Sequence, residues 1–244
     1  MKNLLLGFIL LLLAACGQDK SSAGGSFGDF IKPNYSSFVS LRHCTLKPSN
    51  SLNSLESFIP SLIERLQRKS IDGVEVFFYF PISDSQTDVS QFEVALNYSE
   101  ATSLDSMNEA LETLKFSDIA DCNQEQELQN LSKLKIEAFK PAETIIETMS
   151  CEYLENYNFA TLNLVFEQLI SALADATIEL ELHYLGTDSQ EKDFQWVTVF
   201  PSLEDRALFL KEWRSLQISA EMQGLLSDQA TCNESELFRS YKVI

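Results

Sequence analysis

Apolar residues recur along this chain at two spacings, which predict strands alternating with amphipathic helices. In the first half, Leu55, Phe58, Leu62 and Leu66 lie three or four residues apart, the spacing of one helix face. That helix should begin near Ser54. The same reading places strands at 38–46, 74–80, 92–98 and 131–139, and a second helix at 104–114.

The second half repeats this order of elements. Strands are predicted at 145–153, 178–185, 194–200 and 237–244, with a helix at 160–174. A second helix should start after Pro201, with Ser202 as its N-cap and Leu208, Phe209 and Trp213 along it. Each half is therefore a βαββαβ unit, the split βαβ pattern of ferredoxin-like domains, and the fold class is α+β.

Direct comparison of the two halves supports an internal duplication. Residues 117–123 (SDIADCN) align with 227–233 (SDQATCN), with five of seven positions identical. Cys44 aligns with Cys151, the block 74–79 with 178–183, and the block 92–95 with 194–197. A period near a hundred residues indicates two paired units rather than a solenoid.

The N-terminus has the layout of a cleaved secretory signal. Lys2 precedes an apolar run at 4–13 that is too short to span a bilayer, and small residues lead to Cys16. The segment Leu13-Ala14-Ala15-Cys16 resembles the lipobox of bacterial lipoproteins, which implies lipidation of Cys16; the alternative is an ordinary signal peptide with a chance cysteine. We expect a signal peptide at 1–15, a lipidated flexible tether at 16–36, and ferredoxin-like repeats at 37–140 and 141–244.

The remaining cysteines are even in number, which in an exported chain favours two disulfides over free thiols. First and last strands are neighbours in a βαββαβ sheet, so pairing should occur within repeats, as Cys44–Cys122 and Cys151–Cys232. The alternative pairing, Cys122–Cys151, would instead form a loop across the linker between the two repeats. Close cysteine pairs of the zinc-site type are missing from the sequence, so no metal is expected.

Charge narrows the range of partners. The formal net charge of −18 argues against binding nucleic acid and against docking on anionic lipid, although solubility alone explains it as well. The membrane contact should therefore be made by the lipid anchor, and the internal pseudo-dimer should be a monomer in solution.

Two fused βαββαβ units resemble the dimeric α/β-barrel superfamily, which includes antibiotic-biosynthesis monooxygenases and heme-degrading monooxygenases. The resemblance covers about 38–244 and depends on element order, on the duplication, and on the strand Trp196-Val197-Thr198-Val199-Phe200 running into a helix. It implies one pseudo-dimeric α/β barrel. The competing arrangement is two ferredoxin-like units side by side without a shared barrel.

One strand offers candidate site residues. Along 178–185, apolar residues alternate with Glu179, Glu181 and His183, which should form a row on the opposite face. Inside a barrel such a row could bind a ligand or act as a general base, with Trp196 on the next strand as a stacking surface. On an open sheet it would be a solvated face. The other histidine, His43, lies beside Cys44, and neither histidine is favoured by its spacing as a heme ligand.

No hydrolase elbow, zinc-protease motif, phosphate-binding loop or dinucleotide fingerprint is present in the sequence. We therefore expect an envelope lipoprotein that binds a small ligand or an envelope protein without catalysis and without a cofactor. Its expected location is the outer membrane, facing the periplasm. The alternative is a cofactor-independent monooxygenase-like enzyme acting in the barrel, and a third reading is a structural module whose barrel is filled by aromatic side chains.

Overall fold

The computed structural model describes residues 32–68, 73–82, 90–123, 126–134, 142–174, 179–186 and 192–244. The predicted signal peptide, Cys16 and most of the predicted tether lie outside these ranges. Within them, no helix is both long enough and apolar enough to cross a membrane.

The first repeat has the predicted βαββαβ order, with short additional elements before its last strand. Its main elements are β1 (Ser37–Leu46), α2 (Leu52–Arg68), β2 (Val74–Pro81), β3 (Gln91–Tyr98), α3 (Ala101–Thr113) and β5 (Gln126–Leu134). A single 3₁₀ turn, η3 (Phe116–Asp118), and the short strand β4 (Ala120–Cys122) precede β5.

The second repeat follows the same order with one extra helix. It contains β6 (Glu143–Tyr153), α4 (Phe159–Ala174), β7 (Glu181–Gly186), β8 (Asp193–Phe200), α5 (Leu203–Ser215), α6 (Gln217–Ser227), β9 (Ala230–Cys232) and β10 (Glu236–Lys242). Ser202 caps α5 as predicted, since its Oγ accepts a hydrogen bond from the Asp205 backbone N–H at 3.1 Å. The single helix predicted after it is two helices.

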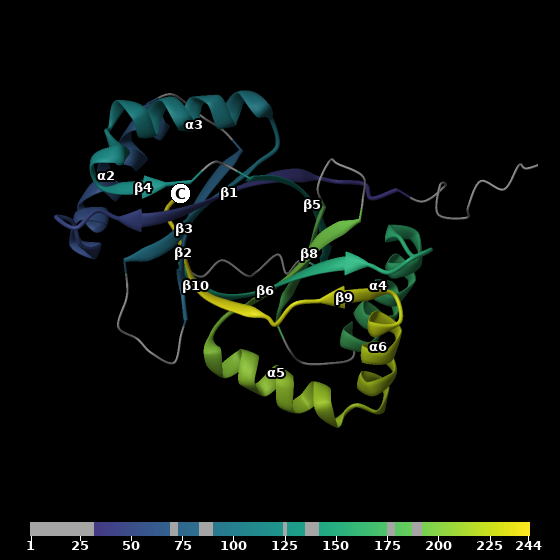
Figure 1. The fold of residues 1–244 in the computed structure, drawn as a ribbon. Helices are drawn as coiled ribbons and strands as arrows, with labels where there is room; N and C mark the ends of the chain where they lie inside the picture. Colours follow the sequence, from purple (N-terminus) through teal and green to yellow (C-terminus); the bar gives the residue numbers. More distant parts are fainter. Residues whose placement is uncertain are drawn as a thin grey trace, which may run out of the picture.

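The two repeats close into one antiparallel barrel, which confirms the pseudo-dimeric arrangement. Strand order is β5-β1-β3-β2 in the first repeat and β10-β6-β8-β7 in the second. The pairings β5–β7 and β10–β2 join the two sheets into a ring (Figure 1). Because the ring is closed, the main strands of both sheets are paired on both edges. Two ferredoxin-like units without a shared barrel would instead expose free edge strands.

Apolar side chains on the outer face of the barrel pack under the helices of their own repeat. In the first repeat Leu55, Leu62 and Met107 of α2 and α3 lie against Val76 and Phe92. In the second, Phe166 and Met222 of α4 and α6 are buried with Tyr184, Trp196 and Phe200. Figure 1 shows α2 and α3 on one side of the barrel and α4 and α6 on the other. The side chains on the inward faces of the strands therefore do not belong to these two cores and surround the interior of the barrel instead.

Two strands differ from their predicted positions. The closing strand of the first repeat is at Gln126–Leu134, not 131–139. The prediction was displaced because the inward face of this strand carries the polar residues Asn130 and Ser132, so the hydropathy pattern does not mark it as a strand. Strand β7 begins at Glu181, so Glu179 precedes it. Residues 135–139 and 178 lie outside the described part.

The disulfide pairing within repeats is confirmed, by a local structure that the sequence did not predict. Cys44 bonds to Cys122 and Cys151 to Cys232, with sequence separations of 78 and 81 residues. The short strands β4 and β9 pair with β1 and β6 and place each cysteine directly opposite its partner. Each bridge therefore joins the first strand of a repeat to the segment just before its last strand.

Reduction of the two bridges should lower the free energy of unfolding by about 2–5 kcal/mol per bridge, because each bond limits the freedom of a long loop in the unfolded chain. Urea denaturation of the oxidised chain and of the Cys44→Ser/Cys122→Ser and Cys151→Ser/Cys232→Ser double variants measures this. Unchanged midpoints in both double variants would contradict the expectation.

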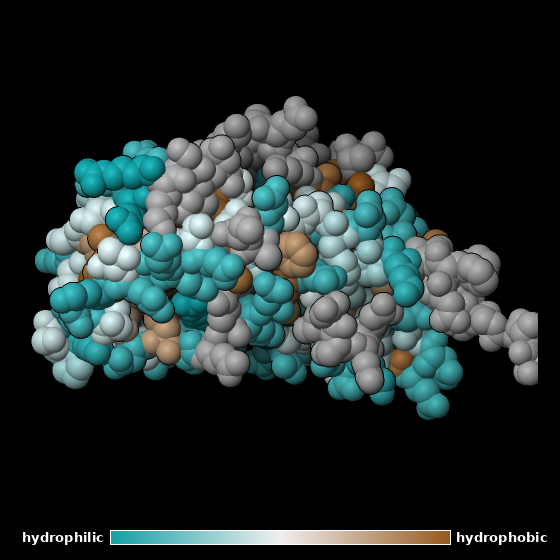
Figure 2. Space-filling view, turned by 90° about the horizontal axis from the view of Figure 1, so that it is seen from above, coloured by the Kyte–Doolittle hydropathy of each residue, from teal (hydrophilic) through white to brown (hydrophobic). Residues whose placement is uncertain are grey.

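The outer surface agrees with the acidic composition. Figure 2 shows a face that is mostly hydrophilic, with hydrophobic residues scattered across it. A binding site for a small ligand is therefore expected inside the barrel rather than on this face.

Candidate functional site

The barrel encloses a cavity of about 680 Å³. It is lined by inward-facing residues from all eight main strands, half of the lining being contributed by each repeat. A volume of this size suits a small organic ligand. The barrel is therefore hollow, although Leu128, Ile146 and Phe238 form a small apolar cluster within it.

Strand register places the lining residues in rows that run across the sheet. One row joins Ser240, Tyr79, Glu93 and His43, which are directly opposite one another on β10, β2, β3 and β1. We call it the acidic row. The matching row of the second repeat joins Asn130, Leu185, Gln195 and Ser150 on β5, β7, β8 and β6, and we call it the neutral row.

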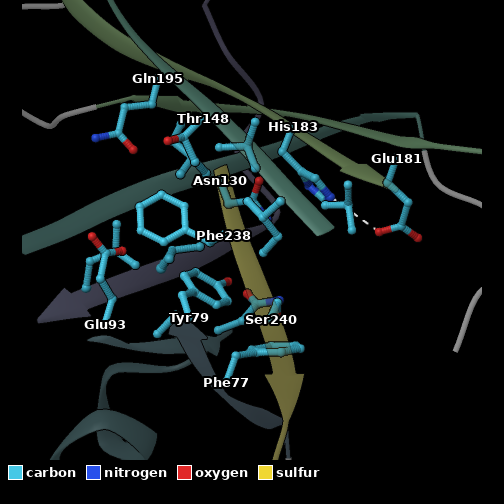
Figure 3. A pocket seen from close by; sticks show the side chains of 18 of the residues that line it. Phe77, Tyr79, Glu93, Asn130, Thr148, Glu181, His183, Gln195, Phe238 and Ser240 are labelled. Carbon is cyan, nitrogen blue, oxygen red and sulfur yellow. Dashed lines mark hydrogen bonds and ion pairs between the residues drawn. The ribbon is translucent and has the colours of Figure 1, made fainter. Parts of the chain in front are cut away.

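The two rows are equivalent in position but not in chemistry. Glu93 corresponds to Gln195, His43 to Ser150 and Tyr79 to Leu185, so only the acidic row contains titratable side chains. Figure 3 shows Glu93 and Tyr79 on one side of the cavity and Gln195 and His183 on the other. Duplication has therefore given one cavity with two different walls.

Among the carboxyl groups of the described residues, Glu93 is the one whose pKa is most affected by its surroundings. Burial raises its pKa, the nearby His43 opposes that effect, and Glu236 adds to it. His43 Nδ1 lies 2.7 Å from Glu93 Oε1, and the side chains are 61% and 12% exposed. Glu93 thus faces the lumen, while His43 connects it to solvent. A carboxyl group with a raised pKa in a cavity is typical of a general base or acid.

Tyr79 remains a neutral hydrogen-bond donor. Burial raises the pKa of its phenol above the usual range, and the carboxylates of Glu93 and Glu75 raise it further. The phenol will therefore not ionise at neutral pH. It can donate a hydrogen bond beside the carboxyl group of Glu93.

Two further pairs of a basic and an acidic side chain face the cavity. His183 Nε2 lies 3.4 Å from Glu181 Oε2, and both side chains are largely buried (Figure 3). Where β10 of the second repeat pairs with β2 of the first, Lys242 bonds to Glu75, and Lys242 Nζ lies over the ring of Phe77, 5.8 Å from its centroid. Phe77, Tyr79 and Phe238 supply aromatic surface to the same space.

The structure brings two of the four predicted ligand-binding residues to the cavity. Glu181 and His183 line it, as the alternation along 178–185 predicted. Glu179 is exposed before the start of β7. Trp196 is on the outer face of β8, where its ring lies 4.6 Å from that of Phe166 in α4 and its Nε1 donates to Thr198 Oγ1. Whether Glu181 and His183 bind a ligand remains a prediction.

The repeat alignment requires a correction of two residues in this region. With Phe92 matched to Phe194, strand pairing puts Glu75 at the position of Glu181 and Phe77 at that of His183. The sequence comparison had matched Glu75 with Glu179. The error arose because alternating strands align equally well when they are shifted by two residues.

The sequence analysis did not predict the acidic row. Glu93 was visible as the polar member of an alternating strand whose inward positions are Glu93, Ala95 and Asn97. His43, considered only as a heme ligand, is the partner of Glu93. Their proximity depends on the β1–β3 register, which a single strand pattern does not reveal.

Metal binding finds no support in the described ranges. Nowhere in them do three or more His, Cys, Asp or Glu side chains form a group arranged to hold a metal ion.

Comparison with known proteins identifies the fold. No protein-family model matches the sequence, and no curated protein matches it. Among solved structures, a candidate monooxygenase from Fusobacterium nucleatum is similar with a TM-score of 0.59 and 10% identity, over 86% of this chain and 94% of its own. The chain has the dimeric α/β-barrel fold.

Two other structures with this fold bind or process different molecules. A chlorite dismutase from Candidatus Nitrospira defluvii has a TM-score of 0.55 and 6% identity, over 85% of this chain and 92% of its own. A heme-binding protein from Thermus thermophilus has a TM-score of 0.53 and 9% identity, over 86% of this chain and 92% of its own. At these identities the likeness establishes the fold alone.

These neighbours overturn the main functional prediction. The sequence analysis preferred a lipoprotein that binds without catalysis, whereas the similar structures include a candidate monooxygenase and chlorite dismutases. They favour the alternative, an enzyme acting inside the barrel. The prediction was wrong because it depended on the absence of known sequence motifs. The lining of this cavity comes from eight strands, so no continuous motif in the sequence marks it.

Proposed function

We propose that this protein is a cofactor-independent monooxygenase-like enzyme that oxidises a small aromatic hydroxyl compound in the barrel cavity, with dioxygen as the oxidant. The observation that carries the proposal is the acidic row, which places a carboxyl group of raised pKa beside a neutral phenol in a hollow lumen. The aromatic side chains of Phe77, Tyr79 and Phe238 supply surfaces on which an aromatic ring can pack.

In this mechanism Glu93 is the general base. Its carboxylate accepts a proton from the hydroxyl group of the substrate, and the hydroxyl of Tyr79 donates a hydrogen bond to the oxyanion that forms. His43, in contact with Glu93 and largely exposed, orients the carboxylate from the solvent side. The deprotonated ring is electron-rich and can reduce dioxygen without a bound cofactor.

The reaction balances without an external reductant. For a hydroquinone, one ring C–H bond is replaced by a C–O bond to one atom of dioxygen, and the other atom leaves as water after the O–O bond breaks. The product is a hydroxyquinone, and all four electrons that reduce dioxygen come from the substrate. Glu93 returns its proton to the departing oxygen.

The lining residues do not fit a heme. Glu75, Glu93, Glu181 and Glu236 face the cavity, and of the described lining residues only Lys242 carries a fixed positive charge, which is already paired with Glu75. Heme propionates would meet this acidic lining without cations to bind them. No step is therefore assigned to heme.

Attachment to the cell envelope through Cys16 is also part of the proposal. Support comes from the lipobox-like segment and from the polar stretch that follows it. Within the described part of the chain, Ser36 and Ser37 at the start of β1 line the cavity.

Incubation of the purified chain with naphthohydroquinone under labelled dioxygen tests the enzymatic proposal. We expect oxygen uptake above the rate of spontaneous oxidation, and one labelled oxygen atom in the hydroxyquinone product by mass spectrometry. In a parallel titration hemin should give no stoichiometric shift in absorbance. Oxidation at the spontaneous rate, or activity only after hemin is added, would contradict the proposal.

A further inference from the structure

A carboxylate and an ammonium group meet in the cavity wall where the two repeats join. Glu75 of β2 accepts a hydrogen bond from Lys242 Nζ of β10, and both residues line the cavity. Lys242 Nζ also lies over the ring of Phe77. A carboxylate and an aromatic face together favour an ammonium group. This part of the lumen is therefore a cation site that the chain itself fills.

The second repeat has the same carboxylate without its cation. Glu181 has the position of Glu75, as the strand register shows. Ser132 of β5 has the position of Lys242 of β10, since each lies directly opposite the residue two places after the glutamate. In the second repeat a hydroxyl group therefore occupies the position that carries the ammonium group in the first.

Glu181 is a partly buried carboxylate of the cavity wall, with 14% of its side chain exposed. Its Oε2 lies 3.4 Å from His183 Nε2, which is long for a hydrogen bond to a charged group. Lys133, next to Ser132 in the sequence, faces outward and binds Glu167 of α4. Within the described ranges, no lysine or arginine forms an ion pair with Glu181.

His183 does not supply the missing positive charge. Its Nδ1 is buried and has no hydrogen-bond partner among the described residues. Protonation there would bury an N–H group without an acceptor, which is unfavourable. The neutral ring with its proton on Nε2 can instead donate to Glu181, so the carboxylate keeps its negative charge.

We infer that the lumen binds a ligand carrying a primary ammonium group, which pairs with Glu181 as Lys242 pairs with Glu75. A neutral ligand of the same shape leaves this carboxylate without a cation. Glu93 and Glu236 also line the cavity, so the charge of the lining favours a cation over an anion. The inference goes beyond the proposed function, because it concerns the charge of the ligand and not its oxidation.

Equilibrium binding to the full chain under anaerobic conditions tests the inference without turnover. Dopamine and 4-ethylcatechol share a dihydroxylated ring, and only dopamine carries an ammonium group at neutral pH. We expect dopamine to bind about 10- to 100-fold more tightly, the range typical for a hydrogen bond between charged groups. Calorimetric titration at physiological ionic strength measures both affinities. Equal affinities, or no binding of either compound, would overturn the inference.

Glu181→Gln identifies the group responsible, because glutamine keeps the size of the side chain and can still accept a hydrogen bond from His183. Dopamine affinity should fall by about 10- to 100-fold, and that of 4-ethylcatechol should stay within about threefold. Glu167→Gln is the matched control, since it removes the same charge on α4 outside the cavity. It should keep the preference for dopamine. A preference that persists in Glu181→Gln would overturn the inference, because the net charge of the chain would then explain it.

Ser132→Lys tests the comparison between the repeats. The new side chain has the position of Lys242, so it should bind Glu181 and remove most of the preference for dopamine. Circular dichroism checks that the variant is folded, and a folded variant with the full preference would contradict the inference. If the variant does not fold, Glu181→Gln alone decides.

The outcomes distinguish this inference from the proposed function. Selective anaerobic binding of dopamine, without oxygen uptake on any of the hydroxylated compounds, would leave the inference standing and refute the enzyme. Oxygen uptake with naphthohydroquinone, together with equal binding of dopamine and 4-ethylcatechol, would do the opposite.

Discussion

Glu93→Gln should lower kcat for naphthohydroquinone oxidation by about 100- to 10,000-fold, the range typical for loss of a positioned general base. The glutamine keeps the size of the side chain and can still meet His43, so the cavity should keep its shape. KM should change little, since the substitution removes proton transfer rather than packing. Steady-state oxygen uptake of the purified variant measures both constants.

The same substitution should make the folded chain more stable at neutral pH. The pKa of Glu93 is raised above its ordinary value of 4.5, so folding favours the neutral form. The stabilisation this provides is complete below the ordinary pKa and is lost as pH rises through the raised one. The stability advantage of Glu93→Gln should therefore grow with pH, while kcat of the unchanged chain should fall as pH drops through the raised pKa.

A matched variant outside the cavity controls for the loss of one negative charge. Glu64→Gln makes the same change on the exposed face of α2, where Glu64 pairs with Arg68. It should keep the kcat and the pH profile of the unchanged chain. Full activity in Glu93→Gln, or an equal loss in Glu64→Gln, would remove Glu93 from the proposed mechanism.

Thr148→Phe should weaken anaerobic binding of naphthohydroquinone by about 10- to 100-fold, because an additional ring would occupy space that the ligand needs. Thr148 is half-buried on β6 and lies in the row formed with Val197 and His183. Figure 3 shows it beside His183 at the cavity wall. Calorimetric titration of the variant measures the effect.

Thr148→Val is the control, because it removes the hydroxyl group with little change in size. Its affinity should stay within about threefold of the unchanged chain, since loss of a single hydroxyl group changes affinity little. The thermal midpoint of Thr148→Phe should remain close to that of the unchanged chain, because a hollow lumen can accept the ring. A large drop in that midpoint would mean that the cavity is not available as the structure describes it.

The sequence by itself determined the repeat, the class of fold and the disulfide partners. Period-two and helical spacings are local properties, and the apolar residues buried under the helices, such as Leu62 and Phe166, follow them closely. The alternation around Glu181 and His183 was readable for the same reason. The resemblance that element order and the internal match supported then implied the barrel, which closes because each sheet leaves two edge strands to pair.

Only the tertiary structure decided which residues share the cavity. The acidic row combines residues from four strands and both repeats: Ser240, Tyr79, Glu93 and His43. It is complete only because β10 of the second repeat pairs with β2 of the first. Strand alternation separates the two faces of a strand but cannot say which face is inside, so Trp196 was placed in the lumen and lies under α4 instead. The pKa of Glu93 is raised by burial among these partners, a property of the closed barrel that no segment of the sequence has alone.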